Sequence, residues 1–436
     1  MQRKTFNPPD WVKEAIFYQI FPDRFAKSDK YKVSGKFFPW GTKPTEHNLC
    51  GGNLQGVTEH LDYLKELGIN AIYFCPVFKS NSNHRYHTFD YFQIDPVLGQ
   101  ESDFLLLLEE AHKKNIRIVL DGVFNHCSRG FFEFNSLLEL GEESPYKDWF
   151  LVDSFPLKAY SGKPNYKCWW NMPALPKFNT NNKEVREFLF RVARYWLEKG
   201  IDGWRLDVPN EIDDDSFWRE FRLQVKKINP DAYIVGEIWD NPSRWLQGDM
   251  FDGVMNYPLR RLLLDFLLKE EHSAKSIQEF CTKTERVFSE QAFGIPLNLL
   301  SSHDTTRLIS QPGGSIKKSA LLSAVLFFMP GAISTYYGEE IAMEGLKDPD
   351  NRRCYPWGAK LSKEKQLYNA FYKKLIDLRK SERALTCGKL KINPQNNGFE
   401  IQRTLKNETL SLQVHFKTHS ESEHFQIFKN GNLLSC

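Results

Sequence analysis

The sequence predicts a (β/α)₈ TIM barrel that carries a small inserted domain after its third strand and a short C-terminal antiparallel β domain. Short apolar runs alternate with longer amphipathic runs, the pattern of parallel strands joined by helices. The alternation gives about eight units, the number that closes such a barrel. Polar side chains follow several of the apolar runs, at the face where barrel strands end. These observations together define the expected architecture.

Each expected element follows from the period of its apolar residues. The apolar runs expected to form barrel strands are 15–22, 71–76, 116–124, 203–208, 232–238, 296–300 and 333–337. The amphipathic runs expected to form helices are 54–67, 103–114, 185–199, 217–228, 317–328 and 365–379. We therefore assign residues 1–126 and 182–380 to the barrel.

Two segments depart from the alternation. Residues 127–181 are rich in Gly, Pro, Ser, Asn and Trp, and they are far longer than an ordinary βα loop. We expect them to form an inserted domain over the mouth of the barrel. Residues 381–436 contain short alternating apolar and polar runs, which predict a small antiparallel β domain.

Charge and composition exclude several classes of protein. The net charge is +3 and no long block of Lys or Arg is present, so neither nucleic acid nor an anionic membrane surface is an expected partner. The longest apolar stretch, 320–330, is too short to cross a bilayer. The N-terminus has no apolar leader segment, which predicts a cytoplasmic protein if this is the native start. Eight scattered cysteines without C-x-x-C spacing are expected to be free thiols, mostly buried. Oligomeric state is not indicated.

Arg205 and Asp207 lie two positions apart in a predicted strand, so their side chains point to the same face. A guanidinium beside a carboxylate keeps the acid ionised and fixes its direction, as a nucleophilic aspartate requires. Taken alone, the pair is better explained as a structural ion pair, because such pairs perturb pKa values without catalysing a reaction. The residues at the other strand ends therefore distinguish a catalytic pair from a structural ion pair.

Polar residues, most of them acids and histidines, lie at the ends of four different predicted strands. Asp121, Asn125 and His126 close the run 116–124, Arg205 and Asp207 close 203–208, and Glu237 closes 232–238; His303 and Asp304 follow 296–300, which we take as the seventh strand of the barrel. Each alone could be a buried structural residue, the interpretation we favour for Asp121 and His112. Four sets that converge on one mouth favour a functional site.

Two chemistries suit such a set of side chains. Paired carboxylates with a third acid suit glycoside hydrolysis, in which one acid attacks the anomeric carbon and another protonates the leaving oxygen. Histidines and aspartates could instead bind metals for hydrolysis. Metal sites favour H-x-H or H-E-x-x-H spacing, and neither occurs here. We therefore favour sugar chemistry and expect no metal.

Four stretches resemble, in order and spacing, the signature stretches of the α-amylase family of retaining glycoside hydrolases. They are 121–126 (Asp-Gly-Val-Phe-Asn-His), 203–207 (Gly-Trp-Arg-Leu-Asp), 236–237 (Gly-Glu) and 302–304 (Ser-His-Asp). The resemblance runs from about residue 14 to residue 380. Finer signals, such as Val-Pro-Asn-Glu after Asp207, resemble the neopullulanase, cyclomaltodextrinase and maltogenic amylase group.

The resemblance implies a role for each matching residue. Asp207 would be the nucleophile, Glu237 the general acid and base, and Asp304 the third carboxylate, which fixes the distorted sugar. Arg205 would orient Asp207. His126 and His303 would bond to hydroxyl groups of the sugar at the cleavage point, and that sugar would stack on Tyr86. Asp348 and Arg352 would bind the next sugar on the non-reducing side. Trp239 would be a ring on which the acceptor sugar stacks. Trp169 or Trp170 could face it, or those two tryptophans could only pack the insertion onto the barrel.

The implied activity is hydrolysis of α-1,4-glucosidic bonds in maltooligosaccharides, cyclomaltodextrins or related α-glucans through a covalent glycosyl-enzyme. A 4-α-glucanotransferase, in which a sugar hydroxyl replaces water, is the alternative with the same nucleophile. A third hypothesis is a catalytically inactive barrel that serves as a binding subunit. That hypothesis requires loss of a carboxylate, and all three are present.

The chain also departs from the resembled group. Members usually begin with an additional β domain, whereas this sequence enters its first predicted strand almost at once. The loop after that strand often holds calcium, but here Asp29 lies among lysines and Asn53 stands where aspartate is common. Because Ca²⁺ binds six or more oxygens, we expect no calcium there and no cofactor. Pro209 and His87 replace the usual alanine and aspartate.

Overall fold

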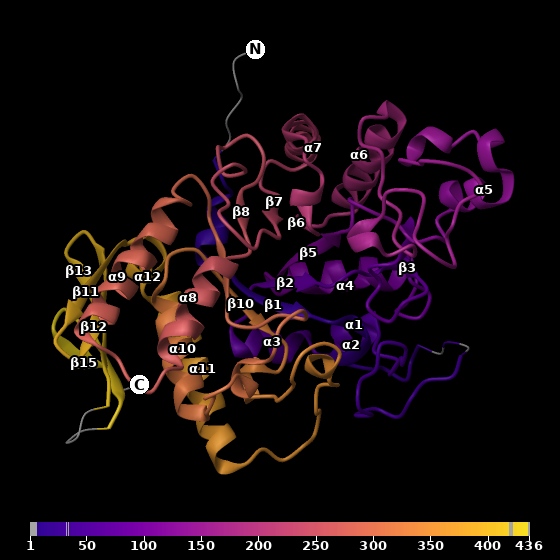
Figure 1. The fold of residues 1–436 in the computed structure, drawn as a ribbon. Coiled ribbons are helices and arrows are strands. Elements are labelled where there is room, and N and C mark those ends of the chain that lie inside the picture. The colour runs from indigo at the N-terminus through magenta and orange to yellow at the C-terminus, as the bar shows by residue number, and fades with distance from the viewer. Residues whose placement is uncertain (1–6, 32, 34, 418–421, 435–436) are drawn as a thin grey trace.

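Eight parallel strands form the centre of the molecule in a computed structural model, which describes residues 7–31, 33, 35–417 and 422–434 (Figure 1). The strands are β1 (Ile16–Ile20), β2 (Ala71–Phe74), β5 (Arg117–Gly122), β6 (Gly203–Leu206), β7 (Tyr233–Gly236), β8 (Gly253–Val254), β9 (Leu297–Leu299) and β10 (Ala332–Tyr336). Their order in the sheet is β8-β7-β6-β5-β2-β1-β10-β9. A parallel bridge between Met255 and Leu297 joins the two edges, so the sheet closes into the predicted barrel.

The barrel strands are apolar because both of their faces are buried. The inward side chains form a compact core that includes Phe17, Tyr73, Val119, Tyr233 and Leu297. A larger apolar cluster lies between the strands and the surrounding helices. Each strand therefore reads as a continuous apolar run rather than an alternating one, as the sequence indicated.

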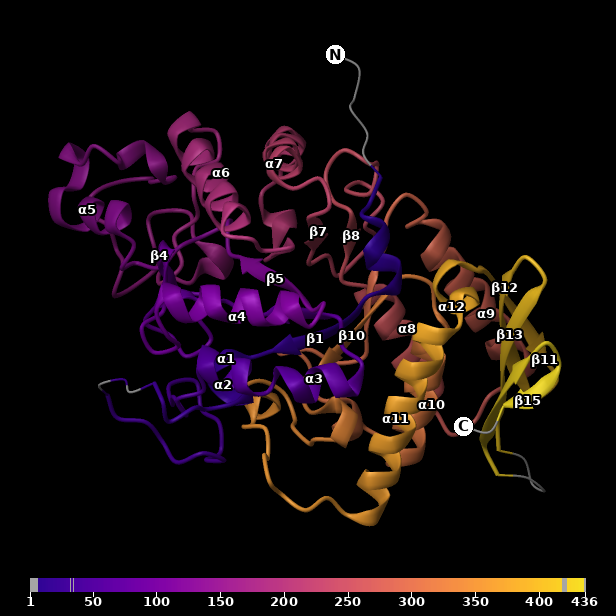
Figure 2. The same ribbon diagram turned by 180° about the vertical axis from the view of Figure 1, so that it is seen from behind.

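Helices surround the barrel (Figure 2). The main ones are α2 (Leu54–Glu59), α3 (Leu61–Leu67), α4 (Glu101–Lys113), α6 (Lys183–Glu198), α7 (Asp215–Ile228), α8 (Tyr257–Leu267), α9 (Ala274–Ser289), α10 (Ile316–Phe328) and α11 (Lys363–Ser381). Several begin at side-chain N-caps, such as Asn182 and Asp214. The single helix predicted over 54–67 is two helices, because the backbone leaves helical geometry at His60.

The sixth barrel strand, β8, is absent from the strands that the sequence predicted. It has two residues, which is too short to show a period. Gly253 lets it approach its neighbours, because a Cβ at this position would lie 2.0 Å from the carbonyl oxygen of Ile295. The following helices, α8 and α9, were also not predicted.

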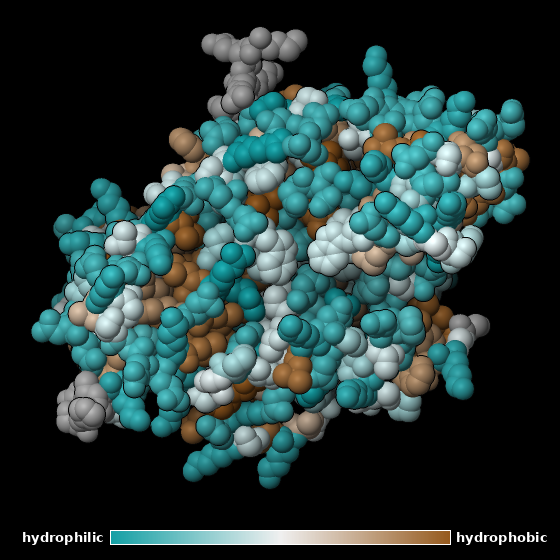
Figure 3. Space-filling model, viewed as in Figure 1, coloured by the Kyte–Doolittle hydropathy of each residue, from teal (hydrophilic) through white to brown (hydrophobic). Residues whose placement is uncertain are grey.

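Two segments extend from the carboxyl ends of the strands. β3 (Phe78–Ser80) and β4 (Thr88–Ile94) form an antiparallel hairpin after β2. Residues 127–181 contain α5 (Phe132–Leu140), short 3₁₀ turns and isolated antiparallel bridges, one of them between His126 and Lys177. On the side of the molecule seen in Figure 1, side chains of intermediate hydropathy gather near the centre of a mostly hydrophilic surface (Figure 3). The boundaries 127 and 181 of an inserted domain remain a prediction.

The C-terminal part is a five-stranded antiparallel sheet, as the sequence predicted. Its strands are β11 (Lys389–Gln395), β12 (Gly398–Leu405), β13 (Glu408–His415), β14 (His424–Lys429) and β15 (Asn432–Leu434). The seven cysteines within the described residues are free. In the described part of the chain, no helix combines the length and apolar character needed to span a membrane.

Candidate active site

Arg205 lies at the centre of the group of acids at the barrel mouth. The register of β5 against β6 places Asp121 beside Arg205, whose Nη1 lies 3.0 Å from Asp121 Oδ1. The same nitrogen lies 2.9 Å from Asp207 Oδ1, while Nη2 lies 2.9 Å from Glu237 Oε2. Arg205 is fully buried. One desolvated guanidinium therefore holds acids from three strands, and it holds Asp207 and Glu237 on different nitrogens.

Asp207 and Glu237 are both largely shielded from solvent. Burial raises the pKa of each carboxyl group, and the charge of Arg205 opposes that rise. Glu237 Oε2 also accepts a hydrogen bond of 3.1 Å from the backbone N–H of Val208. Its other oxygen, Oε1, accepts one of 3.1 Å from the indole N–H of Trp239. Both carboxylates are thus fixed in direction before any sugar arrives.

Asp121, which we expected from the sequence to be a structural residue, lies directly beneath this group. Its Oδ2 accepts hydrogen bonds from the hydroxyl groups of Tyr73 (2.8 Å) and Tyr86 (2.9 Å). Burial raises the pKa of Asp121 to about 6, against the lowering effect of Arg205. Asp121 therefore orients two predicted site residues, Arg205 and Tyr86, from below. His112, also expected to be structural, bonds to Asp202 at 2.8 Å.

His303 connects the seventh strand end to the hairpin between β3 and β4. Its Nδ1 lies 2.8 Å from Gln19 Nε2, and its Nε2 lies 2.6 Å from the Tyr86 hydroxyl. Because the Gln19 amide donates to Nδ1, the imidazole proton is on Nε2, and Tyr86 donates its own proton to Asp121. Burial lowers the pKa of His303 well below its usual value, with help from Arg352 and Arg205. The ring is neutral and is held in one tautomer.

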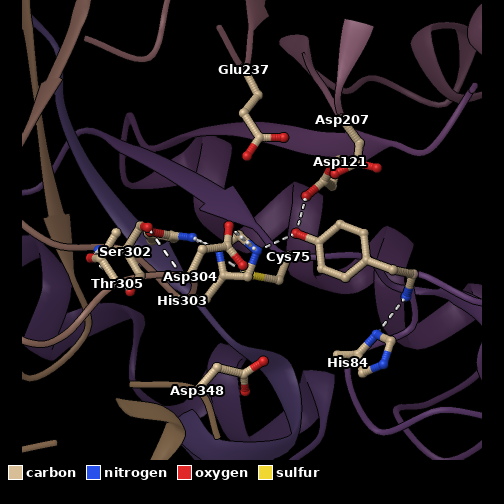
Figure 4. A network of polar contacts seen from close by, with 12 residues as sticks. Cys75, His84, Asp121, Asp207, Glu237, Ser302, His303, Asp304, Thr305 and Asp348 are labelled. Atoms are coloured by element: carbon tan, nitrogen blue, oxygen red, sulfur yellow. Dashed lines mark hydrogen bonds and ion pairs between the residues drawn. The ribbon is translucent and has the colours of Figure 1, made fainter. Parts of the chain in front are cut away.

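Asp304 lies next to His303 and is partly exposed to solvent. Its side chain is 31% exposed, and its Oδ2 lies 3.1 Å from His303 Nε2. Arg352 Nη2 lies 3.5 Å from Asp304 Oδ1, and Arg352 Nη1 lies 2.9 Å from Asp348 Oδ1. Figure 4 shows Asp348 and Glu237 on opposite sides of His303 and Asp304. The predicted pair of Asp348 and Arg352 therefore lies at the same site as the three acids.

His126 lies close to the segment that carries Tyr86 and His87. Its Nδ1 accepts from the Asn125 amide at 3.1 Å, and burial lowers the pKa of the ring to about 3. No hydrogen bond of good geometry reaches its Nε2 among the described residues, although a backbone group of Tyr86 bonds to the ring and opposes the lowering of its pKa. The ring stacks on Trp169 at 5.5 Å, and Trp169 stacks on Trp170 at 4.6 Å. Trp169 therefore packs the insertion onto the site, while Trp170 is 74% exposed.

Trp239 is 38% exposed and lies parallel to Tyr257, with ring centroids 3.7 Å apart. Its indole N–H bonds to Glu237, a contact that sequence reasoning did not predict. Sequence reasoning also missed Gln19, Tyr73 and Tyr257 as members of the network. The signal available for Gln19 was a polar residue inside the apolar run 15–22.

The loop after β1 shows how the residues of the possible calcium site are used. Asn53 Oδ1 accepts from the backbone N–H groups of Ser28 and Gly56, and its Nδ2 donates to Ser28 O at 3.0 Å. The Asp29 side chain is 97% exposed and lies 3.7 Å from Lys27. No group of three or more His, Cys, Asp or Glu side chains that could hold a metal ion occurs among the residues that the structure describes. These donors do not fit the oxygen shell of calcium.

Comparisons with known proteins agree with this geometry. Residues 19–366 match the model of the α-amylase catalytic domain. A cyclomaltodextrinase from Bacillus sp is 46% identical over 91% of this chain and 71% of its own length. Neopullulanase 2 from Thermoactinomyces vulgaris is 43% identical over 98% of this chain and 74% of its own length.

A solved structure gives the same result. The cyclic α-maltosyl-(1→6)-maltose hydrolase from Arthrobacter globiformis, in complex with its cyclic sugar, superimposes with a TM-score of 0.88 at 39% identity. The match covers 94% of this chain and 92% of that one. The chain therefore belongs to the α-amylase family of glycoside hydrolases, as its four signature stretches indicated.

Proposed function

We propose that this glycoside hydrolase cleaves α-1,4-glucosidic bonds of maltooligosaccharides, cyclomaltodextrins and related α-glucans with retention of configuration. The observation that carries the proposal is the fork of Arg205, whose two terminal nitrogens hold Asp207 and Glu237 at 2.9 Å each. Two carboxylates fixed side by side suit a double displacement, because one attacks while the other transfers a proton. The names of the two curated relatives support the substrate class.

In the first step, Asp207 attacks the anomeric carbon as the bond to the leaving oxygen breaks. Glu237 gives its proton to that oxygen and becomes a carboxylate. In the second step, Glu237 takes a proton from water, whose oxygen attacks the same carbon and releases Asp207. Burial supports this cycle, because it raises the pKa of Glu237 and so lets the carboxyl group keep its proton to higher pH than an exposed glutamate would. Arg205 supports it by favouring the ionised form of Asp207.

We assign the surrounding polar groups to the sugar at the cleavage point. The Nε2 of His126 makes no hydrogen bond of good geometry among the described residues, and we assign it a bond to a hydroxyl group of this sugar. His303 and Asp304, 3.1 Å apart, would bind other hydroxyls of the same sugar. Tyr86 would stack on it, while Asp348 and Arg352 would bind the next sugar on the non-reducing side. These assignments are proposals from position and charge.

The second candidate activity is 4-α-glucanotransfer. Its support is the exposed aromatic surface of Trp239 and Trp170, since a sugar acceptor can stack on such rings and compete with water. If Trp239 binds acceptors in this way, Trp239→Ala should lower the ratio of transfer to hydrolysis more than it lowers total cleavage.

One experiment tests the proposal and the alternatives together. The protein is incubated with β-cyclodextrin, pullulan, starch and maltotriose, and the products of each reaction are identified by chromatography. We expect short maltooligosaccharides from β-cyclodextrin and starch, whereas products longer than the substrate from maltotriose would indicate transfer. Absence of turnover on all four would support an inactive barrel and contradict the proposal.

A cytoplasmic location remains a prediction, and so does the absence of calcium.

A further inference from the structure

We propose that Trp239 is a positioning residue for Glu237, because its indole N–H, held in place by Tyr257, orients the carboxyl group and eases release of its proton. This inference rests on the proposed role of Glu237 as general acid and base. It is separate from acceptor stacking, which uses the face of the indole ring rather than its N–H.

The two oxygens of Glu237 have different surroundings. Oε2 accepts the N–H of Val208 at 3.1 Å and lies 2.9 Å from the guanidinium of Arg205. Oε1 accepts the N–H of Trp239 at 3.1 Å. Because Oε2 already binds a cation and an amide, Oε1 is the oxygen that can carry a proton to the leaving group. Trp239 therefore contacts the oxygen at which the proton transfer takes place.

The indole of Trp239 is itself held in a fixed position. Its ring lies over Tyr257 at 3.7 Å between centroids and 10° between planes. Tyr257 is buried at the start of α8, and its hydroxyl lies 3.2 Å from the Ser302 hydroxyl. Arg261 donates to the backbone oxygen of Trp239 at 3.4 Å. A donor held at both its ring and its backbone needs little reorganisation during the reaction.

Val208 provides an independent indication that the direction of Glu237 is under constraint. It has φ 35° and ψ 50°, the left-handed region that a β-branched residue rarely occupies. This conformation directs its N–H at Glu237 Oε2. Strained backbone of this kind persists where the surrounding structure requires it, often at a functional site. Val208 and Trp239 thus hold the carboxyl group, one at each oxygen.

Several charged groups around Glu237 set its pKa, and the indole N–H of Trp239 contributes to that balance. The groups that face Glu237 are Arg205 from β6, Asp207 after β6, Asp304 after β9 and Tyr257 from α8. Burial raises the pKa of Glu237, Arg205 lowers it, Asp304 raises it, and the Trp239 N–H lowers it. A donor to the ionised form favours that form, so loss of the N–H should raise the pKa of Glu237.

Trp239→Phe tests the inference, because phenylalanine keeps an aromatic ring against Tyr257 but has no N–H. The alkaline limb of kcat/KM for maltotriose reports loss of the proton from Glu237 in the free enzyme. We expect this limb to move to higher pH by about one unit in the variant. At the wild-type optimum, kcat/KM for maltotriose should fall about tenfold. With α-maltosyl fluoride, whose leaving group needs little protonation, the fall should be clearly smaller.

Two controls separate this inference from the proposed function. Trp245→Phe changes another tryptophan of the segment between β7 and β8, and it should leave both the pH profile and the substrate ratio unchanged. Glu237→Gln should lose activity on maltotriose far more than on α-maltosyl fluoride. If it does not, the acid role of Glu237 fails, and with it the proposed function.

If Glu237→Gln behaves as expected, two results with Trp239→Phe would overturn the positioning role alone. One is a pH profile and substrate ratio equal to those of the wild type. The other is an equal loss on both substrates without a pH shift, which would mean that Trp239 only packs. Because Trp239 is 38% exposed, we expect the variant to fold, and its melting temperature checks this.

Discussion

Replacement of Arg205 by methionine removes the cation that contacts Asp121, Asp207 and Glu237 while it keeps most of the side-chain volume. A pair of charges at about 4 Å contributes about 4 kcal/mol at an effective dielectric constant of about 20. That energy corresponds to about three pKa units. Because three carboxylates share this cation, we expect the pKa of Asp207 to rise by about one to three units.

In the proposed mechanism Asp207 attacks only as a carboxylate, so the acidic limb of kcat/KM should move to higher pH by the same amount. At a pH on that limb, activity should fall about 10- to 1000-fold, since each unit is a factor of ten. The assay is kcat/KM for maltotriose between pH 4 and 9. Arg205→Lys keeps a positive charge and serves as the matched control, with a smaller shift expected. An acidic limb of Arg205→Met that coincides with that of the wild type would refute the reasoning.

The same substitution has a consequence for stability. Carboxyl groups whose folded-state pKa is raised bind more protons in the folded than in the unfolded protein, so stability falls as pH rises through that pKa. Between pH 5 and pH 8, the melting temperature of Arg205→Met should therefore fall by more than that of the wild type. Equal losses in the two proteins would show that Arg205 does not hold these acids ionised.

Three further changes test other parts of the structure. Asp207→Asn should abolish turnover while leaving the protein folded, because the amide is nearly isosteric but cannot attack; appreciable residual activity would refute the role of Asp207. EDTA should leave both the rate and the melting temperature nearly unchanged, because Asn53 is bonded to Ser28 and Gly56 and Asp29 faces solvent; a large loss of either would reveal a metal site. Gly253→Ala should destabilise the barrel by about 3 kcal/mol or more, because its Cβ would lie 2.0 Å from Ile295 O. The control for Gly253 is Gly130→Ala, where the nearest atom lies 3.6 Å away, and denaturant midpoints compare the two.

Much of the site was predictable because it depends on topology. Parallel strands that close a barrel bring their carboxyl ends to one face, so motifs far apart in the chain had to meet there. The positions of Arg205, Glu237 and His303 follow from this argument alone. The short strand β8 was missed because two residues carry no period, although the count of about eight units required a strand in that region.

The hydrogen bonds within the site were not predictable in this way. The contact between Gln19 and His303 joins residues 284 positions apart, and it depends on side-chain conformation rather than on strand order. The bond from Trp239 to Glu237 likewise requires the indole to lie on Tyr257, from a helix that the sequence did not reveal. Such contacts are set by packing between elements, which hydrophobic period does not encode.

The stereochemistry of the first product tests the central claim most directly. The protein is mixed with maltohexaose in D₂O, and the anomeric protons of the products are followed by NMR before mutarotation is complete. Double displacement through Asp207 and Glu237 predicts that the α-anomer is released first and the β-anomer grows later at the rate of mutarotation. Initial release of the β-anomer would show a single inverting displacement by water and would contradict the assignment of Asp207 as nucleophile.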